Sequence, residues 1–203
     1  MPEHTDRDII TAIDDLTNDA ATWSAAPDDH MPSWAKADGG RMIAVELGIT
    51  GPAFPQLSAS DPAPDIAKLI GDPGVRSYRH LSGMQFWIGR NSVSALPVNE
   101  GATKLLRYLL AAVRDGHYIA SDADRDNARA LLGAAGGGPV IHGPCLVTGV
   151  ADDGGAAPLD ENFRDWFTEV LETVAEQHAL FIAEAIARQL GAEAVDVTFV
   201  RLG

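Results

Sequence analysis

Basic residues and cysteine are scarce in this sequence. Its 203 residues include 29 acidic but only 15 basic side chains, three of them lysine, so the formal net charge is −14 at pH 7. Binding to a nucleic-acid backbone needs clustered Lys and Arg, and anionic membrane surfaces select the same residues. No apolar run reaches the roughly 20 residues that span a bilayer. We therefore expect a protein that binds no nucleic acid directly and no membrane.

The single cysteine, Cys145, excludes an internal disulfide and indicates a reducing compartment. The first residues, MPEHTDRD, are charged rather than apolar, so we expect no signal peptide and a cytoplasmic location. Arginine outnumbers lysine, and Ala, Gly and Asp are abundant. This composition is typical of a GC-rich genome, and a salt-adapted organism is the second interpretation.

Motifs that would compel a reaction are also missing. The glycine-rich segment 133–139 is not followed by Lys-Ser/Thr, so it is not a phosphate-binding loop. Asp152-Asp153-Gly154 has the composition of a cation loop but not its remaining ligand positions. His142 and Cys145 are three residues apart on a predicted strand, which places them on opposite faces. We predict no enzyme activity, no cofactor and no metal site.

The hydrophobic pattern predicts an α+β fold, a small mixed or antiparallel sheet packed by amphipathic helices. The pattern predicts helices over 6–23, 65–70, 99–116, 122–132 and 160–190, and strands over 41–47, 75–80, 84–89, 139–150 and 195–200. The proline-rich stretch 48–64 is predicted to be irregular. In the longest helix, Phe163, Trp166 and Phe167 are expected to be buried. If that apolar side faces a partner instead, a homodimer built on this helix is expected.

The acidity lies at the two ends of the chain. Residues 1–40 carry nine acidic and two basic side chains, a net charge of −7, and residues 151–203 carry eleven and three, a net of −8. The centre, 41–150, has a net charge of +1. The predicted organisation is an acidic N-terminal helix and linker over 1–40, followed by one α+β domain over 41–203 with its long C-terminal helix and final strand.

The middle of the chain contains several short motifs in a characteristic order. These are IAKLIG at 66–71, the strands 75–79 and 84–88, LPVNEGATKLL at 96–106 and IHGPCLVTGVADDGG at 141–155. Over about residues 41–155 the chain resembles a phage- and plasmid-borne family of small proteins catalogued as a domain of unknown function. The matching positions are Asn99, Ala102, Thr103, Gly143 and Gly149. The resemblance implies a mobile-element origin and supplies no catalytic residues.

Two rows of carboxylates are the best candidates for a functional surface. At about 100° per residue the carboxylates of the longest helix share one face, spaced about 4.5–6 Å apart along the axis, comparable with phosphates along a nucleic-acid strand. A second row lies on the first helix. The rows are Asp165, Glu169, Glu172 and Glu176, and Asp8, Asp15 and Asp19. They predict an acidic interaction protein for a basic host protein, with mimicry of nucleic acid as the specific form. A solvated helix face is the plainer interpretation.

A small-ligand or nucleotide-binding protein is the alternative. Arg76, Arg79 and Arg90 are the basic residues of the central strands and could supply anion contacts in a pocket between the sheet and its helices. An enzyme with an unrecognised site is the third hypothesis.

Overall fold

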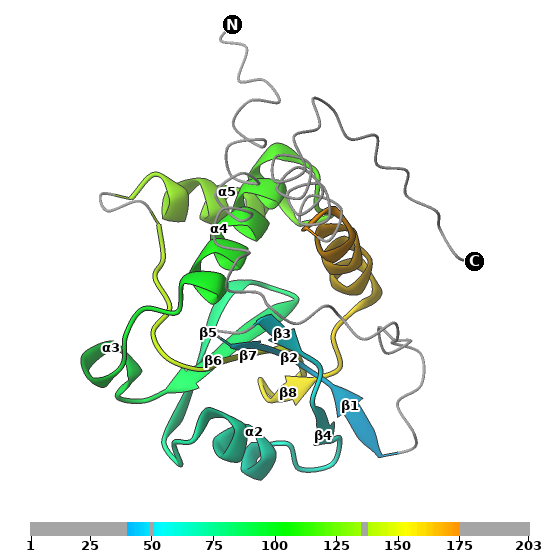
Figure 1. The fold of residues 1–203 in the computed structure, drawn as a ribbon. Helices are drawn as coiled ribbons and strands as arrows, with labels where there is room; N and C mark the ends of the chain where they lie inside the picture. Colours follow the sequence, from blue (N-terminus) through cyan, green and yellow to red (C-terminus); the bar gives the residue numbers. More distant parts are fainter. Residues whose placement is uncertain (1–39, 49–50, 135–137, 175–203) are drawn as a thin grey trace, which may run out of the picture. The chain divides into compact units, whose positions relative to one another are not determined.

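The computed structural model describes residues 40–48, 51–134 and 138–174 (Figure 1). These residues belong to two compact units that divide between residues 164 and 165. The predicted first helix, the final strand and the helix positions beyond residue 174 lie outside the described residues, as do Asp8, Asp15, Asp19 and Glu176. The predicted α+β class is confirmed.

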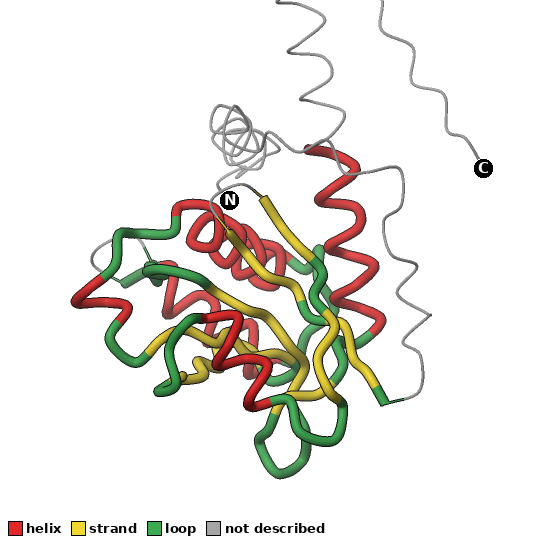
Figure 2. The backbone as a smooth tube through the Cα atoms, turned by 60° about the horizontal axis from the view of Figure 1, so that its bottom comes forward, coloured by secondary structure: helices red, strands yellow, loops and turns green. Residues whose placement is uncertain are grey.

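The first sheet elements form one long hairpin, made by β1 (Arg41–Ile43) and β2 (Val45–Gly48) against β3 (Gly51–Ala53) and β4 (Gln56–Ser58). Its register is constant from Arg41↔Ser58 to Gly48↔Gly51. In Figure 2 the hairpin appears as two adjacent yellow tubes with short green interruptions. The prediction of an irregular stretch at 48–64 was therefore wrong for β3 and β4. Pro52 is tolerated because β3 is an edge strand, which can lack a ladder donor.

The main sheet has the order β3-β2-β7-β6-β5, and all its pairings are antiparallel. The predicted strands 75–80 and 84–89 are confirmed as β5 (Val75–Leu81) and β6 (Met84–Gly89), which form a hairpin with a register shift between Tyr78 and Leu81. Strand β7 (Cys145–Val150) lies between β2 and β6, and its end also pairs with β8 (Ala156–Ala157). The predicted strand 139–150 is therefore shorter at its start, where a single bridge joins Val98 and His142.

Helices cover both faces of this sheet. Helix α2 (Ala63–Ile70) lies below it in Figure 1, and α4 (Glu100–Asp115) and α5 (Asp122–Leu132) lie above it. A short helix that the sequence did not predict, α3 (Ser92–Ala95), follows β6 at the periphery of the fold. Helices α2 and α4 end at glycines in the left-handed conformation, Gly71 (φ 72°) and Gly116 (φ 82°).

The alternation of side chains along the strands divides the core into two layers. Towards α2, the buried cluster consists of Met42, Ala44, Leu57, Ile66, Ile70 and Leu146. On the opposite face, Val45, Val147 and Phe86 form a continuous buried row across β2, β7 and β6. The buried leucines of α4 pack on that side, and α4 contacts β2. Both faces of the central strand are thus sealed from water.

Candidate interaction surface

The acidic row of the longest predicted helix is exposed where the structure describes it. Residues 161–174 are helical, and Asp165, Glu169 and Glu172 are all exposed. Trp166, Phe167 and Val170 are buried, with 7%, 0% and 8% of their surface accessible. The burial of Phe163, Trp166 and Phe167 was predicted and is confirmed. The 3.6-residue period then directs the three carboxylates away from the buried side.

The stretch that carries this row has no basic side chain after Arg164, which precedes it. Residues 165–174 include no Lys, Arg or His. Three arginines elsewhere that might neutralise carboxylates are engaged within residues 40–164. Arg107 donates from Nε to the carbonyl oxygen of Pro139 (3.2 Å), Arg125 pairs with Asp122 (2.7 Å), and Arg129 pairs with Asp126 (2.6 Å).

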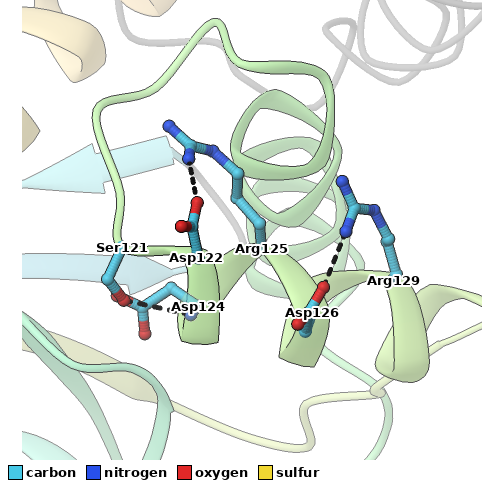
Figure 3. Close-up of polar contacts among 6 residues, drawn as sticks. All are labelled: Ser121, Asp122, Asp124, Arg125, Asp126 and Arg129. Carbon is cyan, nitrogen blue, oxygen red and sulfur yellow. Dashed lines mark hydrogen bonds and ion pairs between the residues drawn. The ribbon is translucent and has the colours of Figure 1, made fainter.

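Helix α5 pairs two of its three acids with arginines of the same helix (Figure 3). Its two ion pairs, Asp122–Arg125 and Asp126–Arg129, both join residues three positions apart, so each acid has a base on the next turn. The third acid, Asp124, accepts hydrogen bonds from Ser121 at the N-cap, through Oγ (2.7 Å), and from Ser82. Two of the three acids of α5 are therefore paired with arginines of the same helix, whereas residues 165–174 contain no basic side chain.

The three arginines of the alternative ligand site do not converge. All three are exposed. Arg76 lies opposite Ile88 of β6 in the strand register. Arg79 donates from Nη2 to the carbonyl oxygen of Gly154 (2.9 Å) in the turn after β7. Arg90 follows the opposite end of β6, beside Gly74. At about 3.3 Å per residue, the length of β6 separates the surroundings of Arg79 and Arg90 by about 17 Å.

A buried polar network joins β2, α4 and the segment before β7. Asn99 caps α4, with Oδ1 accepting from the N–H of Ala102 (2.9 Å). Its Nδ2 also donates to the carbonyl oxygens of Leu47 (2.7 Å) and Gly143 (2.9 Å). Thr103 Oγ1 accepts from the N–H of Ile141 (2.9 Å). These bonds satisfy buried backbone groups, so the network has a structural role. The long-range bonds to Leu47 and Gly143 had no signal in the sequence.

Two buried side-chain atoms of the described residues lack a hydrogen-bond partner, Oε1 of Gln85 and Oγ of Ser92. Gln85 donates from Nε2 to the carbonyl oxygens of Gly149 (3.2 Å) and Gly155 (2.7 Å) near the end of β7. Ser92 begins α3, and Oγ lies against the Cα of Gly89, beside Asp72. The two atoms thus sit at different ends of β6 and do not make one site.

The potential nucleophile of the chain is enclosed. Cys145 is fully buried, and burial raises the pKa of its thiol. His142 does not serve as its base, because Nδ1 lies 3.0 Å from the carbonyl oxygen of Leu96. Within the described ranges, no three His, Cys, Asp or Glu side chains are arranged to hold a metal ion. Those ranges also contain no helix with the length and apolar character of a membrane span.

Comparison with family models, curated proteins and solved structures gave no match to this chain. The resemblance to the phage- and plasmid-borne family over about residues 41–155 therefore stays a prediction.

Proposed function

We propose that this protein is a non-enzymatic acidic binding protein of a mobile genetic element, acting in the host cytoplasm. The exposed row of Asp165, Glu169 and Glu172 would contact a basic surface of a host protein. The observation that carries the proposal is that the row is exposed and that residues 165–174 contain no basic side chain, whereas two of the three acids of α5 pair with arginines of the same helix.

Imitation of a nucleic acid is the specific form of this function. A helix with acids at positions 165, 169 and 172 presents charges about 4.5–6 Å apart along its axis. Exposed carboxylates at this spacing can occupy a groove in which Lys and Arg side chains otherwise bind phosphates. The partner would then be a nucleic-acid-binding protein, and the encounter would be accelerated by long-range attraction.

Competition with DNA tests this function directly. The tagged protein is incubated with nuclease-treated host lysate, and the captured proteins are challenged with duplex DNA or with sodium chloride. Mimicry predicts that DNA and salt both release the captured protein. DNA phosphates would compete with the carboxylates of the row for one basic groove, and salt would screen the attraction between the row and that groove. A capture that resists both would contradict the proposal.

A charge-matched pair of variants identifies the surface. One variant carries Asp165→Asn, Glu169→Gln and Glu172→Gln. The control carries Asp61→Asn, Glu100→Gln and Asp152→Asn, three exposed acids outside the row, so both variants change the net charge equally. The first should slow association with the captured partner about tenfold or more, and the control should change it less than about threefold. Equal effects would mean that net charge, rather than this row, drives binding.

A further inference from the structure

Strand β5 forms one edge of the main sheet, and in the described part of the chain no strand pairs with its outer side. Its seven residues make it longer than the other edge strand, β3, which has three residues and contains Pro52. The backbone N–H and C=O groups of an edge strand are a template for pairing with another chain, and a short strand or a proline reduces that tendency. The edge at β3 has both of these protections, whereas the edge at β5 has neither.

The first part of β5 is uncovered on both faces of the sheet. Residues 76–79 are all exposed, although neighbouring side chains on a strand point to opposite faces. Helix α5 contacts the end of the strand, where Asn127 donates from Nδ2 to the carbonyl oxygen of His80 (2.6 Å). The pairing of β5 with β6 is regular over residues 75–78 and shifts only beyond them. An extended segment therefore has access to β5 over residues 75–79.

The charge of this edge is positive in a strongly acidic chain. Residues 73–99 contain three Arg and no Asp or Glu, although the chain has a net charge of −14. Two of these arginines, Arg76 and Arg79, lie on the open part of β5, and neither forms an ion pair within the described residues. Arg79 donates from Nη2 to the carbonyl oxygen of Gly154 (2.9 Å), which leaves its other N–H groups available. The edge therefore presents two guanidinium groups that no carboxylate neutralises by contact.

These two arginines select the occupant of the edge. A second copy that paired antiparallel with the middle of β5 would set Arg76 of one chain opposite Arg79 of the other, and like charges directly opposite each other destabilise a strand pair. A strand with carboxylates at the two matching positions turns both repulsions into attractions. Between the arginines, the ring of Tyr78 is 40% exposed and can pack against a β-branched side chain of the added strand.

The net charge of the chain does not prevent an acidic segment from binding here. At physiological ionic strength the screening length is about 8 Å, so distant acids of the chain have little effect on a charge at this edge. The arginines within contact distance of the added strand then decide which charge is accepted.

We propose that β5 binds an extended acidic segment of a partner protein as an additional strand of the main sheet. Backbone hydrogen bonds to β5 would supply affinity, and two acidic side chains three positions apart, opposite Arg76 and Arg79, would supply specificity. The inference is independent of the acidic row, which would contact a basic partner through other residues.

Fluorescence polarisation with synthetic peptides tests the proposal. The probe is a labelled, end-blocked peptide, Thr-Glu-Thr-Val-Glu-Thr, whose two acids match the spacing of the two arginines. We expect saturable binding with a dissociation constant below about 100 µM at physiological salt. Exchange of both Glu for Lys should weaken binding at least about tenfold. Exchange of the central Thr and Val for Pro, which has no N–H, should do the same.

Two results with these peptides would overturn the proposal. The first is an acidic peptide that does not bind at concentrations up to about 1 mM. The second is equal binding of the proline peptide, because charge alone would then be sufficient and no strand would be added.

A charge exchange at the edge identifies the surface. Arg76→Glu with Arg79→Glu should weaken binding of the acidic peptide about tenfold or more and should strengthen binding of the Lys peptide. The matched control is Arg41→Glu with Lys68→Glu, which changes the net charge equally at two exposed residues outside β5. It should change binding less than about threefold. Unfolding cannot produce a gain of binding to the Lys peptide, so the exchange separates docking from a structural role. Equal effects of the two pairs would overturn the proposal.

Hydrogen exchange locates the bound peptide. The acidic peptide should slow the exchange of outward-facing amides within residues 75–79 and leave residues 51–53 of β3 unchanged. Binding without slower exchange at residues 75–79 would place the peptide elsewhere and overturn the proposal. Inorganic phosphate at about 10 mM and constant ionic strength should not displace the peptide. Displacement would also overturn the proposal and leave the two arginines as a site for small anions.

Discussion

Ser82 donates both its backbone N–H and its hydroxyl to the carboxylate of Asp124, over 2.9 and 2.6 Å. This contact fastens the tip of the β5–β6 hairpin to the first turn of α5. The other side of the tip faces Asp160, because a Cβ at Gly83 would lie 3.1 Å from its Oδ2. Asp160 in turn accepts from the N–H of Phe163 (2.7 Å) at the start of the last described helix. The hairpin tip therefore lies beside the capping residues of two helices.

Replacement of Asp124 should destabilise this junction. Asp124→Asn removes the charged carboxylate that accepts hydrogen bonds from Ser82 and Ser121. We expect it to lower the free energy of unfolding by about 1–3 kcal/mol in urea titrations at pH 7. Asp122→Asn is the control on the same helix turn, since Asp122 is 96% exposed and only pairs with Arg125. It should cost less than about 1 kcal/mol. Equal losses would mean that the Ser82 contact contributes nothing specific.

The same contact predicts a dependence on pH. Burial alone would raise the pKa of Asp124, but the hydrogen bonds from Ser82 and Ser121 hold it below its ordinary value. A carboxyl with a lowered folded-state pKa stabilises the fold above its unfolded pKa of about 3.9, and this stabilisation is lost as the pH falls through the folded value. The difference in unfolding free energy between wild type and Asp124→Asn should therefore shrink below about pH 4. Burial also lowers the pKa of His80. Its titration affects wild type and Asp124→Asn alike, so it cancels when the two unfolding free energies are subtracted.

The buried amide of Asn99 should not tolerate a charge. Asn99→Asp keeps the capping acceptor but turns a carboxylate towards the carbonyl oxygens of Leu47 and Gly143, and we expect a loss of about 3–5 kcal/mol near pH 7. The loss should lessen as the pH falls, because a protonated carboxyl can donate to a carbonyl oxygen. Asn99→Ser, which retains a cap without the charge, is the control and should show no such pH dependence. Urea titrations of both variants over a pH series measure this.

Gly149 has no space for a side chain. A Cβ at this position would collide with the carbonyl oxygen of Pro158, a backbone atom that cannot rotate away. Gly149→Ala should therefore lower the unfolding free energy by about 1–3 kcal/mol or more. In the control, Gly83→Ala, the nearest atom is a side-chain oxygen of Asp160 that can move. Thermal melts should show a clearly larger decrease for the Gly149 variant than for the control.

The burial of Cys145 makes its thiol a reporter of unfolding. Because burial raises its pKa and excludes reagents, the native protein should react with a disulfide reagent only on the timescale of unfolding. Denaturant should expose the thiol and accelerate the reaction to the rate of a free cysteine. Fast modification in the absence of denaturant would show that β7 opens without global unfolding.

The buried side of the last described helix should contribute far more to the free energy of unfolding than its exposed side. Trp166→Ala should lower the unfolding free energy by about 3–5 kcal/mol, because Trp166 is 7% exposed and its loss leaves a large cavity. The combined Asp165→Asn, Glu169→Gln and Glu172→Gln variant should change it by no more than about 1 kcal/mol, since all three side chains are exposed. Urea titrations of the two variants compare the buried and exposed sides of one helix.

Local patterns in the sequence predicted most of the helices and the β5–β6 hairpin. Each of these elements is bounded by residues that act within a few positions, such as Asn99 at the start of α4 and Gly116 at its end. Strands β3 and β4 escaped prediction because Pro52 and Pro55 normally interrupt a ladder. Their tolerance depends on β3 lying at the edge of the sheet, which is a property of the completed topology.

The candidate surface was predictable where one helix decided it and not where several elements meet. The exposure of Asp165 and Glu169 follows from the period of the apolar side chains around Trp166. The separation of Arg76 from Arg79 could be predicted in part, because residues three apart on a strand lie on opposite faces. The bridge between Val98 and His142 was not predictable, because the two residues lie 44 positions apart in the chain. Nothing local marks that pairing.

Strand β7 is the central strand of the main sheet, yet it is among the last parts of that sheet to leave the ribosome. The hairpins 41–58 and 75–89 are synthesised first, and neither pairs with the other; each pairs with β7. A nascent chain that ends before residue 145 therefore has two hairpins without the strand that joins them, and their apolar faces remain in water. Folding of this domain consequently awaits the synthesis of β7, and we expect the exposed hairpins to engage chaperones during that interval.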